Sequence, residues 1–166
     1  MLQIELNIGP EWQSGINWQK RAEEAVKAAL SVSPHGGLAE RNFALEVSIK
    51  LSDNDEVQKL NAAYRGKDRP TNVLSFPMVT HDLLDSLSNS DDGEVLLGDI
   101  ILAYDVCREE AQDKDIAMEN HASHLLVHGV LHLLGYDHEN EADALNMEAL
   151  EVRALEKLAI GNPYVE

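Results

Sequence analysis

The stretch that decides the fold of this chain is His128-Gly129-Val130-Leu131-His132-Leu133-Leu134-Gly135-Tyr136-Asp137-His138. The apolar residues between the first two histidines are typical of a helix, and residues four apart share one helical face. His128 and His132 can therefore reach the same ion. Gly135 follows where a helix ends in a left-handed residue, so the chain can turn there and bring His138 to that ion. We predict a metal site with these three histidines as ligands.

Three imidazole ligands favour a catalytic metal site over a structural one. A zinc-like ion held by three nitrogens keeps one position open, whereas structural zinc sites are closed by four protein ligands, usually with cysteines among them. We expect one zinc ion per chain. Nickel, copper or another divalent transition metal also binds imidazole well, so the spacing does not identify the ion.

The spacing H-x-x-x-H-x-x-G-x-x-H is that of the extended zincin signature, with one chemical difference. In those metallopeptidases a glutamate follows the first histidine and is the general base, whereas this chain has Gly129. Either the metal alone activates water, by lowering its pKa to about 7, or another residue or the substrate takes the proton. The missing base argues against a metallopeptidase.

The size of the chain favours one domain, and its charge requires that any RNA be bound through local contacts. Its 166 residues are most simply a single domain over 1–166. The formal charge of −17 repels nucleic acid at long range. No apolar stretch approaches the ~20 residues of a membrane span, and no signal-peptide pattern is present, so we expect a cytoplasmic protein without a membrane partner. The single cysteine, Cys107, cannot form an intrachain disulfide and is expected to pack in the core.

The apolar pattern predicts an α+β fold with a small mixed sheet packed with helices. Alternation predicts strands at 2–8, 43–51, 71–77 and 95–102, and helical periodicity predicts helices at 18–30, 53–65, 104–114, 116–134 and 141–159. Asn17 and Asp53 are the expected N-caps, and Asp53 with Glu56 has the form of a capping box. The polar stretch 78–94 is expected to be an acidic surface loop.

Five of the thirteen basic residues lie within twenty positions of a chain that is acidic elsewhere: Lys50, Lys59, Arg65, Lys67 and Arg69. An anion can be held there. Arg65 is expected at the end of a helix, where its five-donor fork can clasp a phosphate and stabilise charge in a transition state. The alternative is a surface ion pair with Asp68, and composition does not decide between the two.

Four further residues are candidates for supporting the metal site. His124 lies one turn before the first ligand on the same face, and we assign it to packing or to support of a ligand. Asp99 in an apolar strand is costly unless it bonds the backbone or orients a ligand histidine. Asp137 and Tyr136 adjoin a ligand and are candidates for proton handling, or for shaping the turn.

The chain resembles the YbeY family of bacterial metal-dependent endoribonucleases. The resemblance rests on the histidine stretch together with Asn61-Ala62-Ala63-Tyr64-Arg65-Gly66-Lys67-Asp68-Arg69-Pro70-Thr71-Asn72-Val73-Leu74-Ser75-Phe76-Pro77. Two shorter segments resemble the family in the same order, Leu97-Gly98-Asp99-Ile100 and Met147-Glu148-Ala149-Leu150-Glu151. The likeness covers about residues 45–165.

The resemblance implies a zincin-like α+β fold and an RNase specific for single strands. It implies a role in maturing the 3′ end of 16S ribosomal RNA and in ribosome quality control. Single-stranded rRNA is then the substrate, and the partners are a small-subunit ribosomal protein and an Era-type GTPase. The acidity of the chain fits a family that reaches RNA through ribosomal partners.

The resemblance also implies roles for individual residues. The family's metal ligands match His128, His132 and His138, and its catalytic arginine matches Arg65. We expect His128 to take part in catalysis as well. The expected substrate-binding residues are Arg65, Lys67 and Arg69.

Three functions stay open on sequence alone. The first is cleavage of RNA phosphodiesters, either by direct hydrolysis or by attack of the substrate's own 2′-OH. The second is peptide hydrolysis. The third is a non-catalytic assembly factor that holds ribosomal RNA or protein in the groove beside the metal.

Overall fold

A four-stranded mixed sheet forms the centre of the computed structural model, which describes residues 2–34, 44–80 and 94–164. The strands are β1 (Leu2–Ile8), β2 (Ala44–Ser52), β3 (Val73–Pro77) and β4 (Glu94–Ala103), in the spatial order β1-β2-β4-β3. The first two strands and β4 are parallel, and β3 runs antiparallel to β4. The predicted α+β fold with a small mixed sheet is confirmed, and each predicted strand lies within two residues of the observed one.

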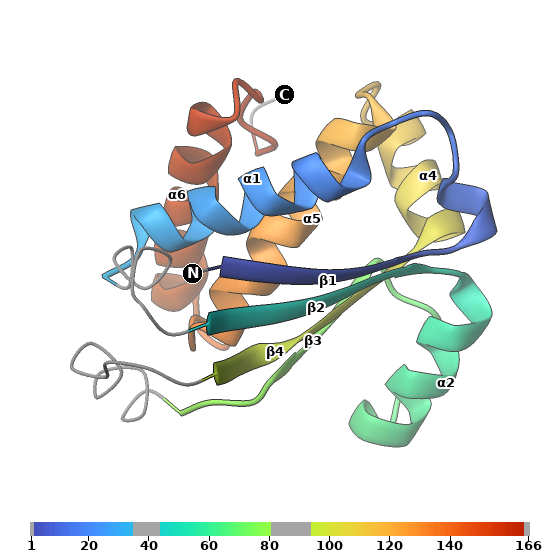
Figure 1. Ribbon diagram of the computed structural model, residues 1–166, viewed down its shortest axis with the longest axis horizontal. Helices are drawn as coiled ribbons and strands as arrows, with labels where there is room; N and C mark the ends of the chain where they lie inside the picture. The colour runs from blue at the N-terminus through green and yellow to red at the C-terminus, as the bar shows by residue number, and fades with distance from the viewer. Residues whose placement is uncertain (1, 35–43, 81–93, 165–166) are drawn as a thin grey trace.

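Helices cover the two faces of the sheet unequally (Figure 1). They are α1 (Trp18–Val32), α2 (Asn54–Arg65), α4 (Tyr104–Asp113), α5 (Met118–Leu133) and α6 (Glu141–Lys157). A short 3-10 helix at Pro10–Trp12 was not predicted. The helices α1, α5 and α6 pack together on one side of the sheet, whereas α2 lies against the other side. No helix in the described part of the chain has the length and apolar character that a bilayer crossing needs.

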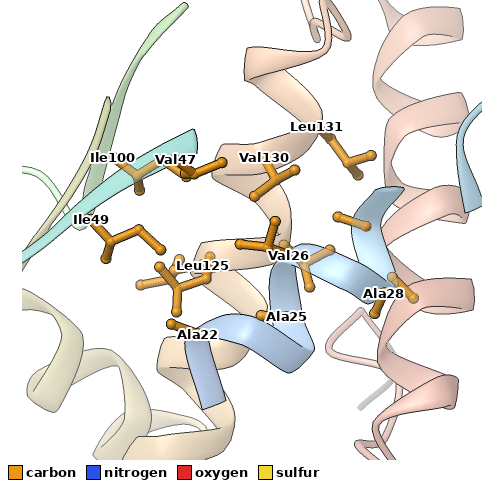
Figure 2. Packing of buried hydrophobic residues seen from close by; sticks show 14 of the residues in the cluster. Ala22, Ala25, Val26, Ala28, Val47, Ile49, Ile100, Leu125, Val130 and Leu131 are labelled. Carbon is orange, nitrogen blue, oxygen red and sulfur yellow. The ribbon is translucent and has the colours of Figure 1, made fainter. Parts of the chain in front are cut away.

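The larger hydrophobic core lies between the sheet and α1, α5 and α6. Small residues of α1 allow it to lie close to α5. Figure 2 shows Ala22, Ala25 and Val26 of α1 together with Leu125, Val130 and Leu131 of α5. A second, smaller cluster joins α2 to the opposite face of the sheet through Val57, Leu74, Ile101 and Ala103. Cys107 is fully buried in the larger core, as expected, and burial raises the pKa of its thiol.

The two predicted N-cap residues cap the helices α1 and α2. Asn17 accepts from Lys20 N at 3.1 Å, and Asp53 accepts from Glu56 N at 2.8 Å. The predicted capping box is wrong in its second half, because the Glu56 carboxylate binds Lys50 and Ser52 instead of the backbone of Asp53. The acidic loop expected at 78–94 falls mostly on 81–93, outside the described residues.

Helix α5 is largely buried between the sheet and the other helices. Eleven of its sixteen residues are buried, so both the sheet and the other helices press against it. Gly129 makes the approach to the sheet possible, because a Cβ there would lie 3.1 Å from the Ile100 side chain and from Ser75 Oγ. The helix ends as predicted: Gly135 has a φ of 100°, and Tyr136 N donates to Leu131 O at 3.0 Å. This turn directs the following residues back toward the end of α5.

Gly98 offers a test of how tightly α5 and the sheet fit together. A Cβ at this position would lie 2.5 Å from Phe76 O and 2.6 Å from Leu133 Cδ2, and the backbone carbonyl cannot move cheaply. We predict that Gly98→Ala lowers the free energy of unfolding by at least ~2 kcal/mol, the scale of overpacking in a core. Urea denaturation measures this. The control is Gly161→Ala, since nothing lies within 4 Å of a Cβ there. Two variants of equal stability would show that the contact at Gly98 relaxes freely.

Candidate metal centre

The structure brings the three predicted ligands together. One imidazole nitrogen from each of His128, His132 and His138 lies within 4.8 Å of the other two. The first two come from the last turns of α5, and the third comes from the chain after the Gly135 turn. His128 and His132 are half-buried and His138 is exposed, so one side of the cluster faces solvent. This is the arrangement of a site with an open coordination position.

Hydrogen bonds at Nδ1 fix which nitrogens are available to an ion. His132 Nδ1 lies 3.0 Å from Tyr136 O, and His128 Nδ1 lies 3.0 Å from Glu151 Oε1. A carbonyl and a carboxylate only accept, so in the neutral rings both Nδ1 atoms donate and both Nε2 atoms carry lone pairs. These two Nε2 atoms lie 3.0 Å apart. Two facing lone pairs repel each other unless a cation lies between them, so this donor set fits a divalent transition metal.

The protonation state of His132 also suits metal binding. Burial, followed by the charges of His128 and His138, lowers the pKa of His132 to about 4. The imidazole is therefore neutral at pH 7. An ion that binds Nε2 has no proton to displace from it, which removes one cost of metal binding.

Glu151 on α6 is the main supporting residue, and sequence reasoning assigned it no role. It is 1% exposed, and its Oε1 accepts from His124 Nε2 at 2.9 Å as well as from His128 Nδ1. Burial by itself would raise the pKa of this carboxyl, but the hydrogen bonds from His124 and His128 outweigh it and hold the pKa at about 2. Glu151 is thus an ionised acceptor that orients a ligand imidazole, a common partner of metal-bound histidine.

A signal for Glu151 was present in the sequence. Its neighbours on the same face of α6 are the buried residues Met147, Leu150, Ala154 and Leu155. A lone carboxylate on an apolar helical face needs partners inside the protein. From the sequence, the segment that contains Glu151 indicates only a family resemblance.

Of the four residues predicted to support the site, three meet it and one does not. Tyr136 meets it through its backbone carbonyl, which accepts from His132 Nδ1 at 3.0 Å. His124 reaches the ligand His128 through Glu151. Asp137 Oδ1 accepts from the backbone N–H of His138 at 2.7 Å, so it shapes the turn that carries a ligand. The expectation that Asp99 orients a ligand histidine is not met: in the described residues, Asp99 lines a cavity of about 520 Å³ on the α2 side of the sheet.

Arg65, Lys67 and Arg69 line a separate cavity of about 340 Å³. The three histidines are not among the described residues that line it. Among the described residues the alternative ion pair with Asp68 is not formed, and the Asp68 carboxylate instead accepts from Gln58 Nε2 at 3.1 Å. Within 2–34, 44–80 and 94–164, Arg65 has no ion pair or hydrogen bond from its side chain, so its guanidinium is available to an anion.

Buried polar contacts hold this basic loop in shape. Asn61, which is 2% exposed, donates to Arg69 O at 2.9 Å and accepts from Lys67 N at 3.2 Å. Gly66 takes the left-handed conformation that ends α2, with a φ of 69°. The three cations are therefore carried on the last residue of α2 and on a loop that is held by its own hydrogen bonds.

A second pair that sequence reasoning missed joins the basic cavity to α5. His121, 1% exposed, lies with Nε2 2.8 Å from Glu110 Oε1, and Asn72 Nδ2 donates to the same carboxylate at 3.1 Å. Burial would raise the pKa of Glu110, but the hydrogen bonds from His121 and Asn72 outweigh it and lower the pKa. Glu110 lines the basic cavity, so the start of β3 and the first turn of α5 are both tied to its wall.

The family model described as Endoribonuclease YbeY matches residues 10–159 of this chain. The chain belongs to the YbeY family. The match begins well before residue 45, so α1 is part of it, whereas β1 precedes the matched residues. The family predicted from the two sequence motifs is confirmed.

Relatives named Endoribonuclease YbeY align over nearly the whole chain. The relative from Sphingopyxis alaskensis is 51% identical, and the alignment covers 100% of this chain and 99% of the relative. The relative from Rhizorhabdus wittichii is 53% identical over 99% of this chain and 97% of its own. The solution structure of TM1509 from Thermotoga maritima is similar, with a TM-score of 0.52 and 24% identity, covering 100% of this chain and 97% of that one. This last likeness concerns the fold alone.

The ligand assignment predicts the metal content of the purified protein. We expect about one ion per chain, and we expect His132→Ala to lower occupancy strongly because two nitrogens cannot hold the ion as three do. Elemental analysis of folded protein, checked by circular dichroism, gives the ratio. Full occupancy in His132→Ala, with no new ligand recruited, would contradict the assignment.

Proposed function

We propose that this chain is a metal-dependent endoribonuclease that cleaves single-stranded RNA. One observation carries the proposal: a three-histidine cluster open to solvent in a chain of the YbeY family. Relatives that share about half of its residues over their full length are named Endoribonuclease YbeY, which supports an RNA-cleaving hydrolase.

In this proposal His128, His132 and His138 hold one zinc ion per chain. When bound, the ion polarises a phosphoryl oxygen and lowers the pKa of a water molecule. Glu151 and Tyr136 O keep the two α5 imidazoles in the tautomer that offers Nε2 to the ion. His128 takes part in catalysis as one of the residues that hold the ion.

The basic cavity supplies the contacts with phosphate. Arg65 is exposed, lies at the end of α2 and is unpaired within the described residues, so its planar fork can meet two phosphate oxygens at once. We assign Arg65 to stabilising the charge that develops on the attacked phosphate, and we assign Lys67 and Arg69 to neighbouring phosphates.

The position of Gly129 argues against a peptidase. Its missing side chain would point at Ile100 and Ser75 on the sheet and not toward the histidine cluster. A glutamate there would face the core, where it could not take a proton from water. The zincin spacing is therefore present without the geometry of the peptidase base.

We place the activity in maturation of the 3′ end of 16S rRNA and in ribosome quality control, in the cytoplasm. A small-subunit ribosomal protein and an Era-type GTPase are the proposed partners. The charge of −17 supports a partner-mediated approach to RNA, because the chain repels nucleic acid at long range. The same charge favours the second candidate function, a non-catalytic ribosome assembly factor.

An assay with and without chelator separates the candidate functions. We expect metal-loaded protein to cleave single-stranded RNA, chelated protein to be inactive, and added zinc to restore cleavage. Unstructured peptide offered to the same preparation should stay intact. Binding of RNA without cleavage by the loaded protein would favour the assembly factor. Chelator-sensitive proteolysis that disappears in His128→Ala would favour the peptidase.

Arg65→Ala tests the phosphate contact. Since the side chain has no described partner, metal content and thermal stability should stay almost unchanged, while RNA cleavage should fall by ~10²-fold or more, the scale of one preorganised donor. Arg65→Lys should restore only part of the activity, because an ammonium lacks the planar fork. The matched control is Lys27→Ala, an exposed cation on α1. Normal cleavage by Arg65→Ala would move the phosphate contact to Lys67 or Arg69.

A further inference from the structure

The segment after α6 returns to the metal centre and contacts it through a phenol. The hydroxyl of Tyr164 donates to Glu151 Oε2 at 2.9 Å, and its ring meets the His124 ring edge-on with centroids 5.7 Å apart. Tyr164 lies beyond residue 159, where the match to the family model ends. Neither the sequence motifs nor the three-histidine cluster assigns it a role.

Local structure directs the chain to this contact. Ala159 takes a left-handed conformation with a φ of 59°, and Ile160 N donates to Leu155 O at 2.9 Å, so α6 ends in a tight reversal. Asn162 Oδ1 then accepts from Tyr164 N at 2.8 Å. A non-glycine residue in the left-handed region costs free energy, so the reversal is held by the contacts that follow it.

We propose that Tyr164 is a positioning residue of the metal centre: its hydroxyl fixes the Glu151 carboxylate in the orientation that holds His128 ready for the ion. The proposal rests on the metal site described above. It does not require that the protein cleaves RNA.

The hydrogen-bond donors around Glu151 divide between its two carboxylate oxygens. Oε1 accepts from the imidazoles of His124 and His128, whereas Oε2 accepts from Tyr164. Glu151 is 1% exposed, so removal of the phenol leaves its Oε2 as a buried acceptor that has lost its donor. The terminal torsion of a glutamate is soft. The carboxylate can then rotate to share the two imidazole donors between both oxygens, which releases His128 from its fixed orientation.

An opposing effect is smaller. Removing the phenol leaves more charge on the carboxylate, which strengthens the remaining hydrogen bond to His128 and makes Nε2 a better ligand. Such polarisation changes a bond by roughly 10–30%. Loss of an outer partner of a metal-binding histidine costs about 10–100-fold in affinity. The loss of orientation is therefore the larger effect, and removal of the phenol is expected to weaken metal binding.

The test measures metal binding by the full chain and uses no RNA. Tyr164→Phe removes only the hydroxyl and keeps the ring beside His124. We expect its Zn²⁺ affinity, measured by competition with a chromophoric chelator, to fall by ~10-fold, the lower end of such effects. The visible absorption of the Co²⁺-loaded protein should change, because it reports the ligand geometry. Tyr104→Phe is the control, since that ring packs on Trp12 in another part of the core.

Two further variants show whether the phenol acts through Glu151. In a Glu151→Gln background the effect of Tyr164→Phe should shrink, because residues that act through one another are not additive. Asn162→Ala loosens the turn without touching the site and should weaken Zn²⁺ binding in the same direction, by less. Wild-type affinity and Co²⁺ absorption in Tyr164→Phe would overturn the proposal, even if thermal stability fell, and so would equal losses in the two backgrounds.

Discussion

The close packing of α5 against the sheet is the constraint on which the rest of the structure depends. Gly129 allows this approach, and the helix is then enclosed by α1 and α6. A helix in that position that carries imidazoles must find acceptors for them inside the protein. Glu110 is hydrogen-bonded to His121, and Glu151 to His124 and His128. The carbonyl of Tyr136 is hydrogen-bonded to His132. The candidate metal centre is therefore the solvent-facing end of a row of partnered histidines.

The parts of the fold that sequence predicted are those whose causes are local along the chain. Alternation and helical periodicity located the strands and helices, and Asn17 and Asp53 marked helix starts. The three-histidine cluster could be predicted because two of its residues lie one helical turn apart and a glycine turn returns the third. Each of these features is set by neighbours within about ten residues.

The parts that sequence missed depend on packing between distant segments. Glu151 meets His124 across twenty-seven positions, and the pair of His121 and Glu110 joins two different helices. The face taken by Asp99 follows from an irregularity: the register of β2 with β4 shifts between Glu46 and Val47, so Asp99 pairs with Ser48 on the α2 side. Composition cannot show such a bulge, because it is a property of two strands together.

The proposed ligands come from two segments, the end of α5 and the turn that follows it. A bound ion would therefore connect these two segments. An ion held by His132 and His138 would be a cross-link that closes the turn at Gly135. Binding to the folded chain alone adds about 2.7 kcal/mol to the free energy of unfolding when the free ion is at a hundred times its dissociation constant. The folded population of such a protein would rise and fall with the concentration of free metal. Scarcity of the ion would then increase the unfolded population and shorten the lifetime of the protein.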